Sequence, residues 1–101
     1  MNIVNAIAKV RFASAKPQRV QLYKNKRLTV ELLCMETDQH IEIDSGQWSY
    51  YVVTGSATIT IDDQKLTVPT GQLAVSNPKE QHTIANAGEG RLVILATGQD
   101  A

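Results

Sequence analysis

The sequence predicts an all-β protein, and three observations carry that prediction. Apolar and polar residues alternate along most of the chain, as they do in strands that bury one face. Gly, Pro, Asn and Asp interrupt the alternation about every ten residues, which is the spacing of turns in a sandwich or barrel. β-branched and aromatic residues, which favour strands, are frequent in the same stretches. Periodicity alone therefore leaves two alternatives, a barrel and an immunoglobulin-like sandwich.

Residues 1–18 are predicted to form an N-terminal segment ahead of the barrel. This stretch is too short for periodicity to separate a short helix from an edge strand. Its apolar residues lie near helical spacing, and they are Ile3, Val4, Ile7 and Val10. Pro17 breaks whatever precedes it.

The main domain is expected over residues 19–97, with 98–101 as a frayed tail. Alternation and flanking turn residues predict strands at 19–23, 28–34, 39–44, 48–54, 56–61, 65–68, 73–75, 82–86 and 91–96. Residues 56–68 read as a hairpin that turns at Asp62-Asp63. In the second strand, Val30, Leu32 and Cys34 share one face and Glu31 lies on the other.

Composition narrows the class of function. The 101 residues suit one domain with a modest core. Because so small a domain buries a limited share of its surface, we expect a homodimer, which would bury more. Ten basic and ten acidic residues cancel, so no global charge directs the chain to nucleic acid or a membrane surface. No apolar run could span a bilayer and no signal peptide is apparent, so we expect a cytoplasmic protein.

The numbers of cysteine and tryptophan residues bear on the choice between a barrel and an immunoglobulin-like sandwich. Cys34 is the only cysteine and Trp48 the only tryptophan, which removes the Cys–Trp–Cys framework of antibody-type sandwiches. An intrachain disulfide is impossible, which is consistent with a reducing compartment. Cys34 has apolar neighbours, so we expect a buried small hydrophobe rather than a nucleophile.

The C-terminal third carries a recognisable spacing. Gly71, His82 and Asn86 stand as in the second signature of the cupins, G-x5-P-x-G-x2-H-x3-N, although Asn77 and Lys79 replace its Pro and second Gly. Residues 50–55, Tyr-Tyr-Val-Val-Thr-Gly, are similar to the end of the first cupin signature. The sequence over about residues 20–96 thus resembles a small single-domain cupin. The resemblance implies a double-stranded β-helix, or jelly-roll barrel, with a ligand in its mouth and frequent dimerisation.

The resemblance also implies where a metal would bind. Two His and a Glu of the first signature, with the His of the second, hold a divalent metal in that family. Counting back from Gly55 places the Glu position on Trp48 and the His positions on Glu42 and Asp44. Counting forward from Asp38 gives a register two residues later, and neither register contains a histidine. We therefore expect either no metal or an unknown divalent metal held by His82, Glu42 and Asp44. Such oxygen-rich ligation suits Mn, Mg or Ca better than Zn.

Six residues are thus candidates for function. His82 is the candidate catalytic acid or base and metal ligand. Trp48, Tyr50 and Asn86 are candidates for a binding pocket, although Asn86 would also suit backbone hydrogen bonding at a turn. Glu42 and Asp44 alternate on one face, which favours a solvated surface over metal binding. His40 is expected at the surface.

Two functions remain open on this evidence. One is the binding of an unidentified small molecule in the barrel mouth without catalysis. The absence of the histidines of the first cupin signature favours this function. The other is a cupin enzyme, a dioxygenase or an isomerase or epimerase, that uses His82 as ligand or acid/base. General acid–base catalysis supplies only about 10²–10⁴-fold, and Lys79 is the only candidate for an additional electrophilic group.

Overall fold

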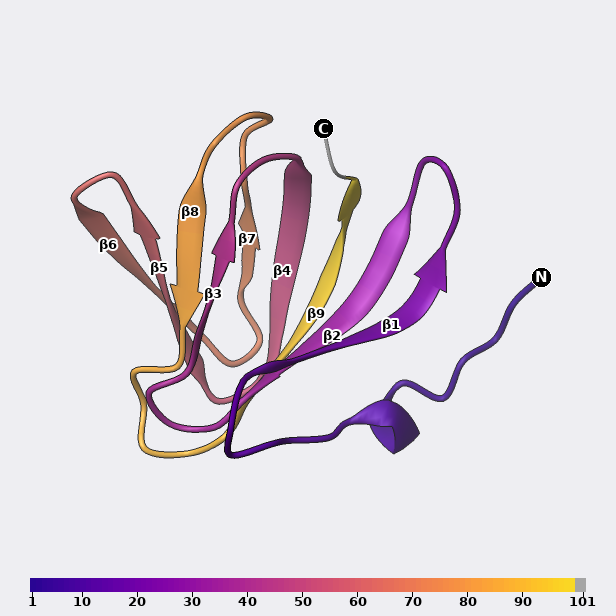
Figure 1. The fold of residues 1–101 in the computed structure, drawn as a ribbon, viewed down its shortest axis with the longest axis horizontal. Coiled ribbons are helices and arrows are strands. Elements are labelled where there is room, and N and C mark those ends of the chain that lie inside the picture. The colour runs from indigo at the N-terminus through magenta and orange to yellow at the C-terminus, as the bar shows by residue number, and fades with distance from the viewer. Residues whose placement is uncertain (100–101) are drawn as a thin grey trace.

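A computed structural model describes residues 1–99, which form two antiparallel sheets folded against each other (Figure 1). A short 3-10 turn, η1 (Ile7–Lys9), precedes the strands. The strands are β1 (Gln18–Lys24), β2 (Thr29–Met35), β3 (His40–Ile43), β4 (Gln47–Thr54), β5 (Ser56–Ile61), β6 (Gln64–Pro69), β7 (Leu73–Val75), β8 (His82–Ala85) and β9 (Leu92–Gln99). No helix among the described residues combines the length and apolar character needed to cross a membrane.

The sheets have the strand orders β1-β2-β9-β4-β7 and β3-β8-β5-β6, and every pairing is antiparallel. Neighbours such as β2 and β9 lie far apart in sequence, as expected of a jelly roll. The all-β prediction is confirmed, and each expected strand is present to within two residues at its N-terminal end. The last strand continues through Gly98 and Gln99, where a tail was expected. The rest of the predicted tail lies outside the described residues.

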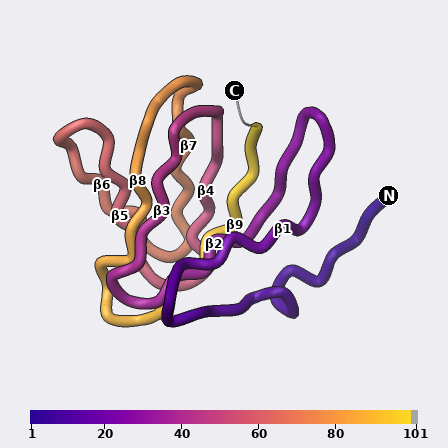
Figure 2. The backbone as a smooth tube through the Cα atoms, in the orientation of Figure 1, coloured from indigo at the N-terminus to yellow at the C-terminus, as the bar shows by residue number. Residues whose placement is uncertain are grey.

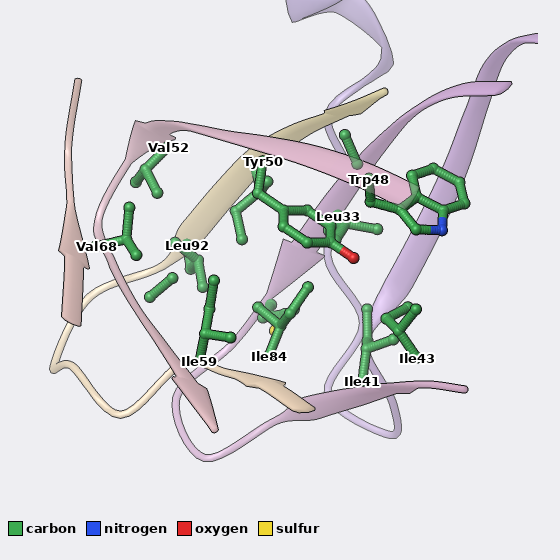
Figure 3. Close-up of a cluster of buried hydrophobic side chains, with 14 residues drawn as sticks. Leu33, Ile41, Ile43, Trp48, Tyr50, Val52, Ile59, Val68, Ile84 and Leu92 are labelled. Carbon is green, nitrogen blue, oxygen red and sulfur yellow. The ribbon is translucent and has the colours of Figure 1, made fainter. Parts of the chain in front are cut away.

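The main core fills the space between the sheets (Figure 3). Leu33, Tyr50, Val52 and Leu92 project from the five-stranded sheet toward residues of the four-stranded sheet, among them Ile41, Ile43, Ile59 and Ile84. Alternation explains the arrangement, because every second side chain of a strand faces the opposite sheet. Most of the barrel interior is therefore occupied by the protein's own side chains.

A second apolar cluster lies on the outside of the five-stranded sheet. Val20, Leu32, Cys34 and Val93 are buried there, under the partly buried Val10 and Phe12 of the N-terminal segment. The predicted faces of β2 are thus correct, but the apolar face carrying Leu32 and Cys34 points outward. Glu31 is buried on the opposite, barrel-facing side.

Gly55 holds the turn between β4 and β5. Its φ of 90° lies in the left-handed region that favours glycine. A Cβ at this position would lie 2.5 Å from the carbonyl oxygen of Arg91, so the neighbouring β9 leaves no room for a side chain. This close approach accounts for the glycine that ends the Tyr-Tyr-Val-Val-Thr-Gly stretch.

Candidate functional site

His82 opens β8 and faces the barrel interior. Its cross-strand partner is Ile43, and directly opposed residues of an antiparallel pair share a face. The side chain is buried, with 5% of the residue exposed. The Nδ1 atom lies 2.8 Å from the carbonyl oxygen of Glu80, and Nε2 lies 2.7 Å from the hydroxyl of Tyr50.

These contacts determine the tautomer of the neutral ring. A carbonyl oxygen only accepts hydrogen bonds, so Nδ1 of His82 carries the proton that is donated to Glu80. In the neutral ring Nε2 is then the acceptor, and the Tyr50 hydroxyl donates to it. His82 is therefore held in one orientation by partners on both sides of the ring.

Aromatic rings extend the site along β4. Tyr50 meets His82 edge to face, with ring centroids 5.5 Å apart, and stacks at 6.5 Å on Trp48. Trp48 is 1% exposed, and its indole N–H has no hydrogen-bond partner within residues 1–99. The indole packs against Gly98, where a Cβ would come within 2.6 Å of the ring. Trp48 and Tyr50, both predicted for a pocket, therefore lie side by side, and Tyr50 is the one that contacts His82.

A cavity of about 70 Å³ adjoins Tyr50 and His82. Its walls are mainly apolar side chains of β5, β6 and β7, including Ile59, Val68 and Ala74. Tyr50 and His82 provide polar atoms, and Glu80 and Ser76 also border it. Trp48 and Asn86 are not among its lining residues.

Asn86 is buried and has a structural role. Its amide nitrogen donates to the carbonyls of Met35, at 3.1 Å, and Gly90, at 2.8 Å, and its side-chain oxygen accepts from the N–H of Gly88. The side chain thus ties the end of β2 to the loop between β8 and β9. The geometry places Asn86 in the backbone-bonding role that was the alternative to a pocket residue.

The predicted metal ligands do not form a metal-binding group within residues 1–99. Glu42 and Asp44 are exposed and alternate with Ile43, whereas His82 shares the inward face of Ile43. All three border one shallow depression at the sheet surface, but no group of three or more His, Cys, Asp or Glu within residues 1–99 is arranged to hold a metal ion.

The observed hydrogen bonds also disfavour a metal at His82. A ligand bond from Nε2 would displace the Tyr50 hydroxyl, and Nδ1 is engaged by Glu80. The inward positions of β3 carry Ile41 and Ile43, which offer no donor atom. The residues present therefore do not fit the metal centre implied by the resemblance. His40 is exposed on the opposite side of β3, as predicted.

An ion pair at the β1–β2 end of the barrel was missed from the sequence. Arg19 forms a salt bridge with the buried Glu31, with Nε 2.9 Å from Oε1, and its guanidinium lies 5.9 Å from the Trp48 ring centroid. The sequence does place an acidic residue, Glu31, within the apolar strand expected at 28–34. Buried carboxylates are paired, so Glu31 indicated that a charged partner exists. The partner was not identified, because a bulge between Gln21 and Tyr23 shifts the register of β1 against β2.

Cys34 has no catalytic setting. Burial raises the pKa of its thiol, and the nearby Arg11 only partly offsets this effect. A protonated thiol packed in an apolar cluster is a poor nucleophile. The expectation of a buried small hydrophobe is confirmed by its burial.

Comparison with known proteins now defines the class. A family model of the cupin domain matches residues 35–98, and the chain therefore belongs to the cupin family. A search of the curated proteins found no match.

Solved structures share the complete fold. The TT1209 protein from Thermus thermophilus is 14% identical with a TM-score of 0.89, covering 99% of this chain and 98% of that one. An uncharacterized protein with a double-stranded β-helix domain from Klebsiella pneumoniae is 18% identical with a TM-score of 0.88, covering 99% and 90%. A cupin superfamily protein from Desulfitobacterium hafniense is 22% identical with a TM-score of 0.80, covering 91% and 84%. At these identities the likeness establishes the double-stranded β-helix and not an activity.

Proposed function

We propose that this cupin binds the apolar end of a small molecule in the cavity beside Tyr50 and His82, without a metal. The observation that carries the proposal is a buried, hydrogen-bonded polar pair at the edge of a mainly apolar cavity. Ligand sites typically combine apolar walls with a few polar groups that orient the ligand.

Cavity size limits what can enter. At about 70 Å³ the space is well below the roughly 300–1,000 Å³ of pockets that enclose a whole drug-sized ligand. The space therefore admits only a small part of such a ligand. A short unbranched aliphatic group therefore matches the space, and the remainder of the ligand would lie outside it.

Short alcohols provide a direct test. Amide and methyl NMR spectra would be recorded with the series from 1-propanol to 1-hexanol. We expect saturable shifts at Ile59, Val68 and Ala74. The variant Ala74→Leu should abolish them because the larger side chain fills the cavity, whereas Ala87→Leu, at an exposed site, should not. Shifts that survive in Ala74→Leu, or their absence in wild type, would refute the proposal.

Metal-free proton transfer is a second candidate, favoured by the Tyr50–His82 hydrogen bond. In that role His82 would take a proton from a bound molecule through the Tyr50 hydroxyl and return one afterwards. Short aldehydes and ketones in D₂O test this directly, because exchange next to the carbonyl replaces C–H with C–D. Catalysed exchange that disappears in His82→Gln would support an enzyme. Exchange at the uncatalysed rate would leave binding as the function.

We also propose cytoplasmic residence. A lone buried thiol within an apolar cluster supports it, since disulfides are rare in that compartment. Fractionation of cells that make the native, untagged protein would test this proposal, and recovery outside the cytoplasm would contradict it.

A further inference from the structure

Basic and acidic residues are segregated along the chain, although their numbers are equal. Residues 1–30 contain seven of the ten basic residues and none of the ten acidic ones. The remaining residues contain three basic and ten acidic side chains, so the two parts carry net charges of +7 and −7. The balanced total thus conceals a strongly basic part, which can attract anions that the chain as a whole would not.

The fold keeps the two kinds of charge apart. The β1–β2 turn lies at one end of the long axis, and the β5–β6 turn, with Asp62 and Asp63, lies at the other (Figure 1). Of the seven basic residues, only Arg19 is paired, with Glu31. The other six are exposed and form no salt bridge with any residue that the structure describes; they are Lys9, Arg11, Lys16, Lys24, Lys26 and Arg27.

Three of the unpaired cations surround the turn between β1 and β2. They are Lys24, Lys26 and Arg27, called the basic turn below. Asn25 holds this turn, because its side-chain oxygen accepts the backbone N–H groups of Arg27 and Leu28, both at 2.8 Å. The charged side chains are therefore not needed to form the turn, and they make a compact positive patch at its surface.

An apolar segment runs beside the basic turn. Residues 1–9, called the arm below, consist of an irregular stretch followed by the 3-10 turn η1. Their course outside the barrel is clear in the tube of Figure 2. A groove of about 600 Å³ separates the arm from the sheet, and its walls include Met1, Val4, Tyr23, Asn25 and Leu28. The arm and the basic turn thus border the same groove.

Two isoleucines of the arm are not used by the fold. Ile3 is 90% exposed and Ile7 is 80% exposed, and neither lines the groove. Removing one isoleucine side chain from water strengthens an association by at least about tenfold. Exposed apolar side chains beside lysine and arginine are typical of segments that lie in the interface of an anionic membrane.

The exposed residues favour a lipid surface over a nucleic acid. Proteins that bind single strands combine basic grooves with aromatic side chains on which bases stack. The only aromatic residues within 1–30 are Phe12 and Tyr23, and both are partly buried. The exposed apolar residues of this part are aliphatic, which suits contact with lipid chains.

We propose that this end of the molecule binds reversibly to an anionic lipid surface, with the basic turn over the headgroups and the two isoleucines of the arm inserted between them. The groove between the arm and the basic turn shares no lining residue with the cavity beside Tyr50 and His82, so the inference goes beyond the proposed function. It agrees with cytoplasmic residence, because the cytoplasmic leaflet is the one that carries anionic lipids.

Co-sedimentation of the full, untagged chain with vesicles tests the proposal. Vesicles of phosphatidylglycerol and phosphatidylcholine in equal parts should bind the protein, whereas phosphatidylcholine alone should not. Each basic residue near an anionic surface contributes about fivefold, so Lys24→Gln with Lys26→Gln should weaken binding about 25-fold. The matched control, Lys65→Gln with Lys79→Gln, removes two exposed charges outside residues 1–30 and should leave binding unchanged.

Two results would overturn the proposal. One is no binding to the mixed vesicles, or equal binding by the two double variants. The other is binding of single-stranded DNA by a chain that ignores the vesicles, which would make nucleic acid the partner. Circular dichroism and sedimentation velocity would check that the variants keep the fold and the oligomeric state of wild type.

Insertion of the arm has its own readout. A polarity-sensitive dye would be attached through Ile3→Cys, in a Cys34→Ala background so that no other thiol can react. Its emission should shift to the blue on the mixed vesicles. The same dye attached through Thr67→Cys, at an exposed site on the four-stranded sheet, should not shift. Unshifted emission at position 3 while the protein is bound would overturn the insertion.

Discussion

The hydroxyl of Tyr50 lies 2.7 Å from Nε2 of His82 and joins β4 of one sheet to β8 of the other inside the barrel. The same imidazole is anchored on its other side by the carbonyl of Glu80. This pair places hydrogen-bonding atoms at the edge of a mainly apolar cavity.

Removing the Tyr50 hydroxyl should destabilise the fold. Tyr50→Phe leaves the buried Nε2 of His82 without its donor, and an unsatisfied buried group costs about 1–3 kcal/mol. Urea denaturation would measure the free energy of unfolding. Tyr51→Phe is the matched control, because Tyr51 is the next residue along β4, is 42% exposed and points outward. Equal losses in the two variants would contradict the importance of the pair.

Asn86→Ala should be more damaging than a surface Asn→Ala change. It removes two donors to backbone carbonyls and one acceptor for Gly88, so a loss of at least about 2 kcal/mol is expected. Thermal and urea unfolding would report it. Asn77→Ala, in an exposed loop, serves as the control. A difference within experimental error would rule out the structural role of Asn86.

Gly98→Ala should disturb the aromatic row. Its Cβ would lie 2.4 Å from the carbonyl oxygen of Gln47 and 2.6 Å from the Trp48 ring, so the ring or the strand must move. We expect lower stability and an altered tryptophan emission spectrum, which reports Trp48 alone. Gly90→Ala meets no atom within 4 Å and should leave the emission unchanged. An unchanged Gly98→Ala spectrum would show that Trp48 is less confined than described.

Cys34 should resist alkylation in the native protein. Burial raises the pKa of its thiol, so the reactive thiolate is scarce, and reaction with iodoacetamide should require unfolding. Mass spectrometry would follow the labelling with and without denaturant. Rapid native labelling would contradict the burial of Cys34.

The same pKa shift gives stability a pH dependence. Above the ordinary thiol pKa of 9.0 the unfolded chain loses the Cys34 proton while the folded chain retains it. The folded state then binds more protons, so the contribution of Cys34 to stability is complete below pH 9 and declines as the pH rises further. Urea titrations between pH 7 and 10.5 would measure this slope, which should be smaller in Cys34→Ala. An identical slope in the two proteins would assign it to other groups.

Local pattern was sufficient for the strands and for several individual residues. Alternation predicted that His82, Ile84 and Asn86 share a face, and all three are buried. Spacing also identified Gly55, whose position requires glycine because β9 passes close by. The shared face follows from the two-residue period of a strand, which is visible in the sequence, whereas Gly55 was identified by its place in the family signature.

Site residues were harder to predict, because spacing along a strand does not determine which face points inward. Counting along the signature placed Glu42 and Asp44 at metal positions, yet the fold turns them outward and puts Ile41 and Ile43 inward. A shift of one residue exchanges the two faces, so a register error in the loop after β2 is enough to misplace a whole ligand set.

Alternation and turn residues predict an all-β protein from local pattern alone. The spacing of Gly71, His82 and Asn86 adds the resemblance to cupins, which implies the barrel. The pairings of Tyr50 with His82 and of Arg19 with Glu31 become visible only in the folded chain. The same holds for the outer apolar face, which is covered over one half. The Tyr50–His82 contact exists only once the two sheets face each other. The Arg19–Glu31 pair depends on the register between the consecutive strands β1 and β2, and the cover of the outer face depends on where the N-terminal segment packs.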